Sequence, residues 1–200
     1  MEDILACCES VSKQLQELLC GYLWAVSDAS RMKVKDLSRF LIMSLSELQS
    51  TFRKGGRVEG ICVRPARLVA PHIMSAVEAE TDRGLSGDRY RQNGGGRQVT
   101  LIQAEHLEAI RSFLGLAKID FSVTRRNLLV SGINLLALKG LRFKVGEALL
   151  EYSGECHPCS RMEEALGVGG YNAMRGHGGI TARVISSGFI RTGDEVMAVV

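Results

Sequence analysis

A succession of short β-favouring runs separated by glycine turns constrains the fold of this chain more than any other feature of its sequence. The runs comprise residues 58–63, 99–102, 128–130, 141–145, 148–152, 180–185 and 195–200. Turn signals such as Ser131-Gly132, Val145-Gly146 and Gly193-Asp194 separate several of them. Many short strands joined by tight turns are typical of a barrel or a folded sheet, so we expect a β-rich fold with few helices here.

Helical spacing dominates the sequence before the first of these runs. Apolar residues recur every three or four positions over residues 4–26 and again over residues 34–52. We therefore expect an α-helical hairpin over residues 1–52, followed by the β-rich domain over residues 53–200. Apolar faces at this spacing are normally buried, so the hairpin either packs on its own domain or pairs with another subunit in a homodimer. One further helix is expected inside the β-rich domain, from Gln103 to about Leu114.

Composition and charge exclude several classes of partner. Of the 200 residues, 46% are hydrophobic and 24% are charged, and the net charge is +3. That balance is ordinary for a globular protein, and no stripe of Lys and Arg or aromatic platform indicates nucleic-acid binding. No apolar run reaches the length of a membrane span, and the start Met1-Glu2-Asp3 is acidic where a signal peptide is positive. We therefore expect a cytoplasmic setting in which the six cysteines are free thiols.

The stretch Glu155-Cys156-His157-Pro158-Cys159-Ser160-Arg161-Met162 carries the groups from which we expect the chemistry. It follows a strand-like run and sets two thiols three residues apart, with an imidazole between them. A thiolate ligates soft metals or carries a sulfane sulfur, and an imidazole exchanges protons near neutral pH. A free cysteine is often a small buried hydrophobe, and this alternative stays open for Cys156 in particular. Cys159 is the stronger candidate for the reactive thiol.

The four residues from Ser160 to Glu163 have the form of a capping box. They predict a short helix with Ser160 as its N-cap that runs to about Leu166. The N-terminal end of a helix is positive, and together with Arg161 it would favour the thiolate form of Cys159.

Three polar stretches stand out against this scaffold. They are residues 84–90, which include Asp88 and Arg89; Arg125-Arg126-Asn127, directly before an apolar run; and residues 169–179, which include Arg175 and His177. Arginine forks and backbone amides at glycines suit the recognition of phosphate, but each stretch alone is equally consistent with a solvated loop. Residues 169–179 are so rich in glycine that we expect no regular structure there.

In their order and spacing, these motifs resemble a MOSC domain, the domain named for the carboxyl end of molybdenum cofactor sulfurase. The resemblance rests on residues 84–90, 98–102, 125–132, 156–161, 178–184 and 188–194. It covers roughly residues 57–198 and leaves out the helical hairpin. It implies a pyruvate-kinase-like β-barrel with a few helices, in a stand-alone member of the bacterial type.

The resemblance also implies roles for individual residues. Cys159 matches the functional cysteine, which ligates molybdenum of the molybdenum cofactor (molybdopterin) in one branch of the family and is proposed to hold sulfur in another. Arg125 and Asn127 match the family's cofactor contacts, and Arg64 and Arg89 resemble its other basic contacts. A dithiolene-bound metal and a phosphate require a soft thiolate and guanidinium groups, and the chain has both.

The leading interpretation is a molybdenum-dependent oxidoreductase that reduces a small N-hydroxylated compound, such as a hydroxylaminopurine, an amidoxime or a hydroxamic acid. It would need an electron-donor protein, and His157 and His177 are its candidate proton donors. The alternative is a sulfur carrier, in which Cys159 receives a persulfide from a pyridoxal-phosphate cysteine desulfurase. A third interpretation takes Cys156 and Cys159 as a dithiol redox pair, but the strand-helix-strand pattern expected around such a pair is absent.

Overall fold

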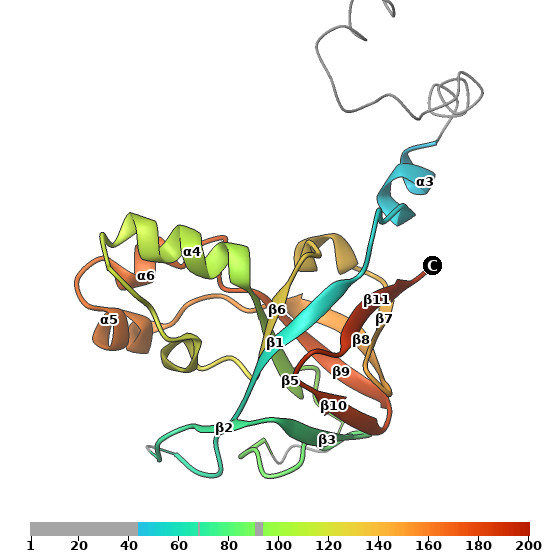
Figure 1. The fold of residues 1–200 in the computed structure, drawn as a ribbon, viewed down its shortest axis with the longest axis horizontal. Helices are drawn as coiled ribbons and strands as arrows, with labels where there is room; N and C mark the ends of the chain where they lie inside the picture. Colours follow the sequence, from blue (N-terminus) through green and yellow to red (C-terminus); the bar gives the residue numbers. More distant parts are fainter. Residues whose placement is uncertain (1–43, 68, 91–93) are drawn as a thin grey trace, which may run out of the picture. The chain divides into compact units, whose positions relative to one another are not determined.

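The computed structural model describes residues 44–67, 69–90 and 94–200, and Ser50–Val200 form one compact unit (Figure 1). Most of the predicted helical hairpin lies outside the described residues. Its described end contains helix α3, Leu45–Ser50, which falls within the second predicted helix. Within the described residues, no helix combines the length and the apolar character that crossing a membrane requires.

Seven strands of the compact unit close into a β-barrel. They are β1 (Gly56–Val63), β5 (Val99–Gln103), β6 (Leu128–Ser131), β7 (Arg142–Val145), β8 (Ala148–Glu155), β9 (Ile180–Ser186) and β11 (Glu195–Val199). Their order is β11-β7-β8-β9-β5-β6-β1, and pairing of β1 with β11 closes the ring. Each of the seven predicted runs becomes one of these strands, so the predicted β-rich barrel is confirmed.

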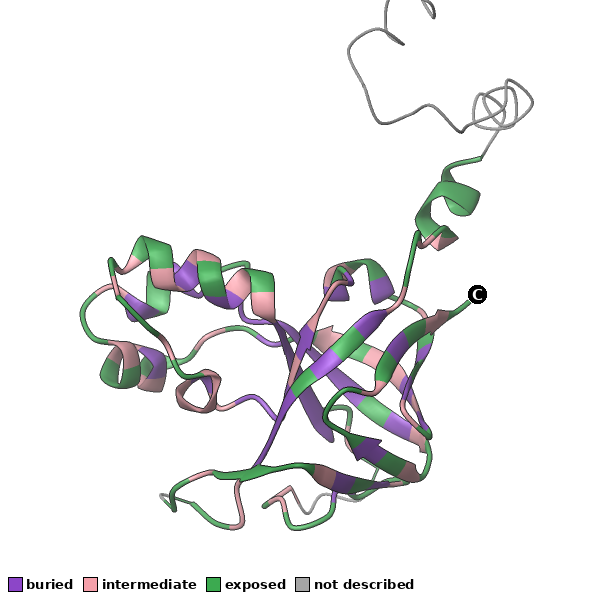
Figure 2. Cartoon of the chain, viewed as in Figure 1, coloured by how far each residue is buried: buried purple, intermediate pink, exposed green. Residues whose placement is uncertain are grey.

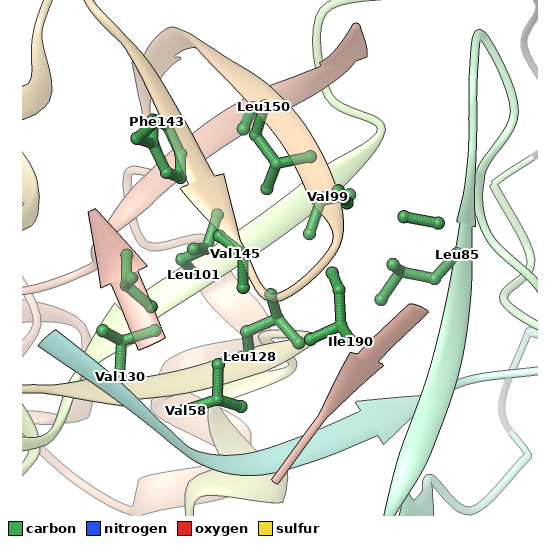
Figure 3. Close-up of a cluster of buried hydrophobic side chains, with 14 of the residues drawn as sticks. Val58, Leu85, Val99, Leu101, Leu128, Val130, Phe143, Val145, Leu150 and Ile190 are labelled. Atoms are coloured by element: carbon green, nitrogen blue, oxygen red, sulfur yellow. The ribbon is translucent and has the colours of Figure 1, made fainter. Parts of the chain in front are cut away.

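Apolar side chains, mostly from the barrel strands and from the neighbouring small sheet, form the main core. Figure 3 labels ten of the buried residues: Val58, Leu85, Val99, Leu101, Leu128, Val130, Phe143, Val145, Leu150 and Ile190. Burying one such side chain fully is worth about 1.5–3 kcal/mol. The alternation of buried and exposed residues over the first half of β1 gives that part of the strand one inner and one solvated face, as Figure 2 shows. All of β5 is buried, because helix α4 (Ala104–Phe113) also contacts it.

Four short strands lie outside the barrel. Strand β2 (His72–Met74) extends the barrel sheet beyond β1, and β3 (Ala76–Glu80), β4 (Gly84–Leu85) and β10 (Gly188–Arg191) form a second sheet. The sequence pattern predicts none of these four. They have two to five residues each, and β2 is exposed throughout, so no run of buried residues marks it.

Three helices gather on one side of the barrel around a second, smaller core (Figure 1). They are α4, which agrees with the helix predicted from Gln103 to Leu114, α5 (Ser160–Leu166) and α6 (Gly170–Ala173). The expectation of no regular structure over residues 169–179 is wrong at α6. Gly170 permits the close packing of α6 on α5, since a Cβ there would lie 2.6 Å from the Met162 carbonyl oxygen.

Candidate functional site

One cavity brings together Cys159, His157 and the four predicted cofactor contacts, Arg64, Arg89, Arg125 and Asn127. It has a volume of about 570 Å³. Its lining comprises Arg64, Asp88, Arg89, Tyr90, Arg97, Gln98, Thr100, Arg125, Arg126, Asn127, Cys156, His157, Pro158, Cys159 and Met162. These residues come from the segments after β1, β4 and β8, from the segments before β5 and β6, and from β5 and α5 themselves. The closed barrel therefore assembles a site from parts of the chain that are remote in sequence.

Cys159 lies at the entrance of α5 with an exposed side chain. Helix α5 ends at Leu166 as predicted, but its N-cap is Cys159 rather than Ser160. The capping box is also wrong, because the Glu163 carboxylate does not reach back to the start of the helix. It accepts hydrogen bonds from the backbone N–H groups of Gly169 (2.7 Å) and Tyr171 (2.8 Å), and it thereby fixes the turn that leads into α6. The exposed thiol of Cys159 is accessible to a ligand in the cavity.

Cys156 is buried, with only 2% of its surface exposed, yet it lines the same cavity. Its Sγ accepts a hydrogen bond from Nη2 of Arg97 at 3.6 Å. Burial of this cysteine agrees with the plain alternative drawn from the sequence. The guanidinium beside it distinguishes it from an ordinary core cysteine, and Arg97 is a cavity residue that the sequence reasoning missed.

Both the oxygen and the nitrogen of the Asn127 side-chain amide form hydrogen bonds with other groups of the protein. Its Oδ1 accepts from the backbone N–H (3.1 Å) and the hydroxyl (2.7 Å) of Thr100. Its Nδ2 donates to the carbonyl oxygen of Cys62 (3.2 Å) and to Oδ1 of Asp88 (3.2 Å). Both amide hydrogens are therefore engaged, and Asn127 holds strands β1 and β5 and the Asp88 loop together at the base of the cavity. A direct contact of this amide with a cofactor, as the resemblance implies, would require one of these bonds to break.

Arg126 is another buried polar residue of this wall; the sequence placed it in a polar stretch beside Arg125 and Asn127 but gave it no role of its own. Its Nε donates to the carbonyl oxygen of Gly178 (2.7 Å), its Nη1 to that of Thr124 (2.7 Å) and its Nη2 to that of Cys156 (2.9 Å). Burial lowers the pKa of this guanidinium, and the nearby Cys156 opposes the shift. Arg126 thus ties the cysteine segment to the loop before β9.

The open side of the cavity carries arginines whose charges are not neutralised. Among the described residues, the guanidiniums of Arg89 and Arg125, which line the cavity, and of Arg161, which does not, make no hydrogen bond or ion pair with protein groups. Burial lowers the pKa of Arg125, and the like charges of Arg64, Arg161 and Arg89 lower it further. Guanidiniums that repel one another at a cavity are stabilised by an anion.

Arg125 also has a strained backbone, with φ 62° and ψ 30° in the left-handed region. A residue other than glycine costs about 1–3 kcal/mol there. Such strain persists only where the surroundings impose it, and it is common at binding sites.

Three buried donor atoms on the cavity wall lack a partner. Within the described part of the chain, Nε of Arg64, the hydroxyl of Tyr90 and Nε2 of Gln98 have no hydrogen-bond partner. Gln98 is only 1% exposed, and its Oε1 accepts from the backbone N–H of Val184 at 2.8 Å. An unsatisfied buried polar group costs about 1–3 kcal/mol, so three of them on one cavity indicate a ligand with acceptor atoms. Sequence reasoning missed the roles of Tyr90 and Gln98, although both belong to the motifs that carried the resemblance.

His177 does not line this cavity, contrary to its candidacy as a proton donor. Its ring centroid lies 4.8 Å from that of His106 and 5.5 Å from that of Phe113, so it packs against α4. His157, by contrast, is exposed and lines the cavity beside Cys159. Of the two candidate proton donors, only His157 is in place.

The β-barrel fold agrees with the family that the sequence motifs indicated. A MOSC domain model matches residues 87–197, which is more than half of the chain. The protein belongs to the MOSC domain family.

Solved structures of the same fold extend the comparison. The YuaD protein from Bacillus subtilis is 22% identical, with a TM-score of 0.63 over 71% of this chain and 94% of that chain. YiiM from Geobacillus stearothermophilus is 19% identical, with a TM-score of 0.60 over 72% of this chain and 75% of that one. YiiM from Escherichia coli is 20% identical, with a TM-score of 0.53 over 72% and 70%. No curated protein matches the sequence. At these identities the likeness establishes the fold.

Proposed function

We propose that this protein binds the molybdenum cofactor through Cys159 and uses it to reduce small N-hydroxylated compounds. One observation carries the proposal: an exposed thiol shares a cavity with arginines of unneutralised charge and with three buried donors that lack partners. Membership of the MOSC family supports it, because the family is named for a protein of molybdenum cofactor metabolism.

The residues present fit this cofactor. A cysteine thiolate is a suitable ligand for a thiophilic metal such as molybdenum. The phosphate of molybdopterin suits the guanidiniums of Arg64, Arg89 and Arg125, which form strong charge-assisted hydrogen bonds with such groups. Its pterin offers ring nitrogens and a carbonyl as acceptors for the unpaired donors of Tyr90 and Gln98.

The chain contributes binding, orientation and protons. When bound, the cofactor would supply the transfer of two electrons to the N–O oxygen of the substrate. Cys159 would hold the metal through its thiolate, and Arg126 fixes the segment that carries Cys159 through its bond to the Cys156 carbonyl oxygen. His157, exposed on that segment, would donate one of the two protons that the reduction consumes as the oxygen leaves as water, and solvent would supply the other. An electron-donor protein completes the cycle.

Elemental analysis of molybdenum tests the proposal. The protein would be made in a host that synthesises the cofactor, together with Cys159→Ser and, as the matched control, Cys156→Ser. We expect about one molybdenum per subunit in the parent and in Cys156→Ser, and none in Cys159→Ser. Equal metal in the parent and in Cys159→Ser would remove Cys159 from the metal site.

The exposure of Cys159 also supports a second function, that of a sulfur carrier. A persulfide must be reached by the desulfurase that loads it and by the acceptor that receives it, and an exposed thiol permits both. Cyanide-labile sulfur on the parent protein and not on Cys159→Ser, with no molybdenum on either, would favour this function over reduction.

A further inference from the structure

A second cavity adjoins the one that contains Cys159. It has a volume of about 670 Å³, and it shares Arg64, Arg89 and Arg125 with the first cavity. Its other walls come from the segment between β1 and β2, from the 3-10 helix Phe121–Thr124 and from α5. Both volumes lie in the range of small-molecule sites, so the two cavities form one composite site with three arginines between its halves.

The charge of the second cavity is strongly positive. Arg67 and Arg161 line it and do not line the first cavity, and Glu164 is its one carboxylate among the described residues. Together with the three shared arginines, five arginines and one glutamate therefore line the cavity. Arg161 lowers the pKa of Arg125 by like-charge repulsion, after burial and Arg64. An anion in this cavity would relieve that repulsion.

The same cavity has an apolar side. It is lined by Ala66, Val69, Ala70, Pro71, Val123 and Ala165. A simple inorganic anion would leave this surface in contact with water. A ligand with an anionic end and an organic body would use both parts of the cavity.

We propose that the second cavity binds the substrate, and that this substrate carries a phosphate group, as a nucleotide does. The inference rests on the proposed reductase function and specifies its substrate class as an N-hydroxylated nucleotide rather than a free base. The phosphate binds Arg161 and Arg67, and the organic body lies along the apolar side. The N–O end then points past the shared arginines toward Cys159. The single phosphate of the cofactor would bind arginines of the first cavity, so Arg67 and Arg161, which line only the second cavity, remain available for a second anion.

Equilibrium binding of AMP and adenosine, measured by isothermal titration calorimetry, tests this assignment without any turnover. The two probes differ by one phosphate, and neither has an N–O bond to reduce. Titrations use the full-length parent protein and Cys159→Ser, so that the result does not depend on molybdenum. We expect AMP to bind at least about tenfold more tightly than adenosine to both proteins, from the strength of charge-assisted hydrogen bonds to phosphate.

Variants of the arginines locate the phosphate. Arg161→Gln and Arg67→Gln should each weaken AMP about tenfold and leave adenosine unchanged, and Arg161→Lys should weaken AMP less. Arg83→Gln is the matched control, because Arg83 is 74% exposed in its side chain and lines neither cavity. Arg83→Gln should bind AMP as the parent does.

Three results would overturn the inference. The first is equal affinity for AMP and adenosine, and the second is no binding of AMP. The third is loss of molybdenum from Arg161→Gln while its affinity for AMP is preserved, because that result would assign Arg161 to the cofactor. Failure of the reductase proposal is distinguishable, because it shows as absence of molybdenum from the parent. AMP binding that depends on Arg161 in such a metal-free protein would still support a phosphate-binding second cavity.

Discussion

Two sides of the first cavity use the same kinds of polar residue in opposite ways. On the buried wall, the side chains of Arg126 and Asn127 donate hydrogen bonds to other groups of the protein. On the open side, among described residues, the guanidiniums of Arg89 and Arg125 have no hydrogen-bond or ion-pair partner in the protein. Arg125 and Arg126 are adjacent in sequence, so the difference is one of environment and not of residue type.

The comparison indicates that the residues of the buried wall stabilise the fold, whereas the residues of the open side serve ligand binding. A satisfied buried network stabilises the fold and costs several hydrogen bonds when it is broken. Guanidiniums that repel one another destabilise the folded chain until a ligand neutralises them. We therefore expect substitutions on the wall to lower the free energy of unfolding, and substitutions on the open side to lower affinity for anions with little loss of stability.

Asn127→Ala should have the largest effect on stability. The substitution removes the hydrogen-bond partner that Asn127 provides to Thr100, to the Cys62 carbonyl oxygen and to the Asp88 carboxylate. All three groups are buried or half-buried. Groups left unsatisfied at such positions cost about 1–3 kcal/mol each, so we expect a loss of about 3–5 kcal/mol in urea unfolding. Asn172→Ala, at an exposed asparagine, is the control and should change stability by less than about 0.5 kcal/mol. A loss for Asn127→Ala no greater than that of the control would contradict the role of Asn127 in the network.

Substituting the two adjacent arginines gives the most direct test of the comparison. Arg126→Met leaves three carbonyl oxygens without their donor, and we expect it to lower the free energy of unfolding by about 2–3 kcal/mol. Arg125→Met removes no protein hydrogen bond and should lie within about 0.5 kcal/mol of the parent. Urea unfolding of the pair measures both. Equal losses would show that the wall and the open side do not differ in the way described.

The parts of the fold that could be predicted are those that local sequence patterns specify, and the parts that were missed depend on contacts between distant residues. The seven barrel strands are runs of aliphatic residues that face the core, and such runs are visible in the sequence. The exposed strand β2 and the two-residue strand β4 have no such pattern, because their pairing depends on neighbours brought by the fold. Helix α6 was missed because glycines at its start signal a loop locally, while close packing on α5 requires Gly170.

The site was predictable as a set of motifs but not as a network. Cys159, His157 and the arginines were found from residue chemistry and from the resemblance, and the structure places them around one cavity. Whether a polar side chain is satisfied is decided by atoms far away in sequence. The bonds of Arg126 reach to Gly178, and Gln98 is held at its Oε1 by the backbone of Val184 while its Nε2 has no partner among the described residues. No sequence pattern reports such pairings.

Arg125→Gly should sharpen the comparison by separating backbone strain from binding. Glycine adopts the left-handed conformation of residue 125 without steric cost, and this gain exceeds the entropy that glycine adds to the unfolded chain. We expect a gain of about 0.5–1 kcal/mol in the free energy of unfolding, together with weaker binding of AMP. Arg125→Ala provides the control, because it removes the guanidinium and keeps the strain. Lower stability of the glycine variant than of the alanine variant would contradict the assignment of strain to Arg125.

The smallest expected effect lies at His106, away from both sides of the cavity. Burial lowers the pKa of His106, and the adjacent His177 lowers it further, while Glu105 acts in the opposite direction. In the window between the unfolded pKa, about 6.5, and the lower folded pKa, the unfolded chain binds more protons than the folded one. Stability should therefore fall as the pH decreases through this window, and His106→Gln should make the fall shallower. Urea unfolding of parent and variant between about pH 7 and about pH 5 measures the difference, in which contributions of the shared carboxylates cancel. A steeper fall in His106→Gln would mean that the folded state favours the charged imidazole, which is opposite to the effect of its buried contact with His177.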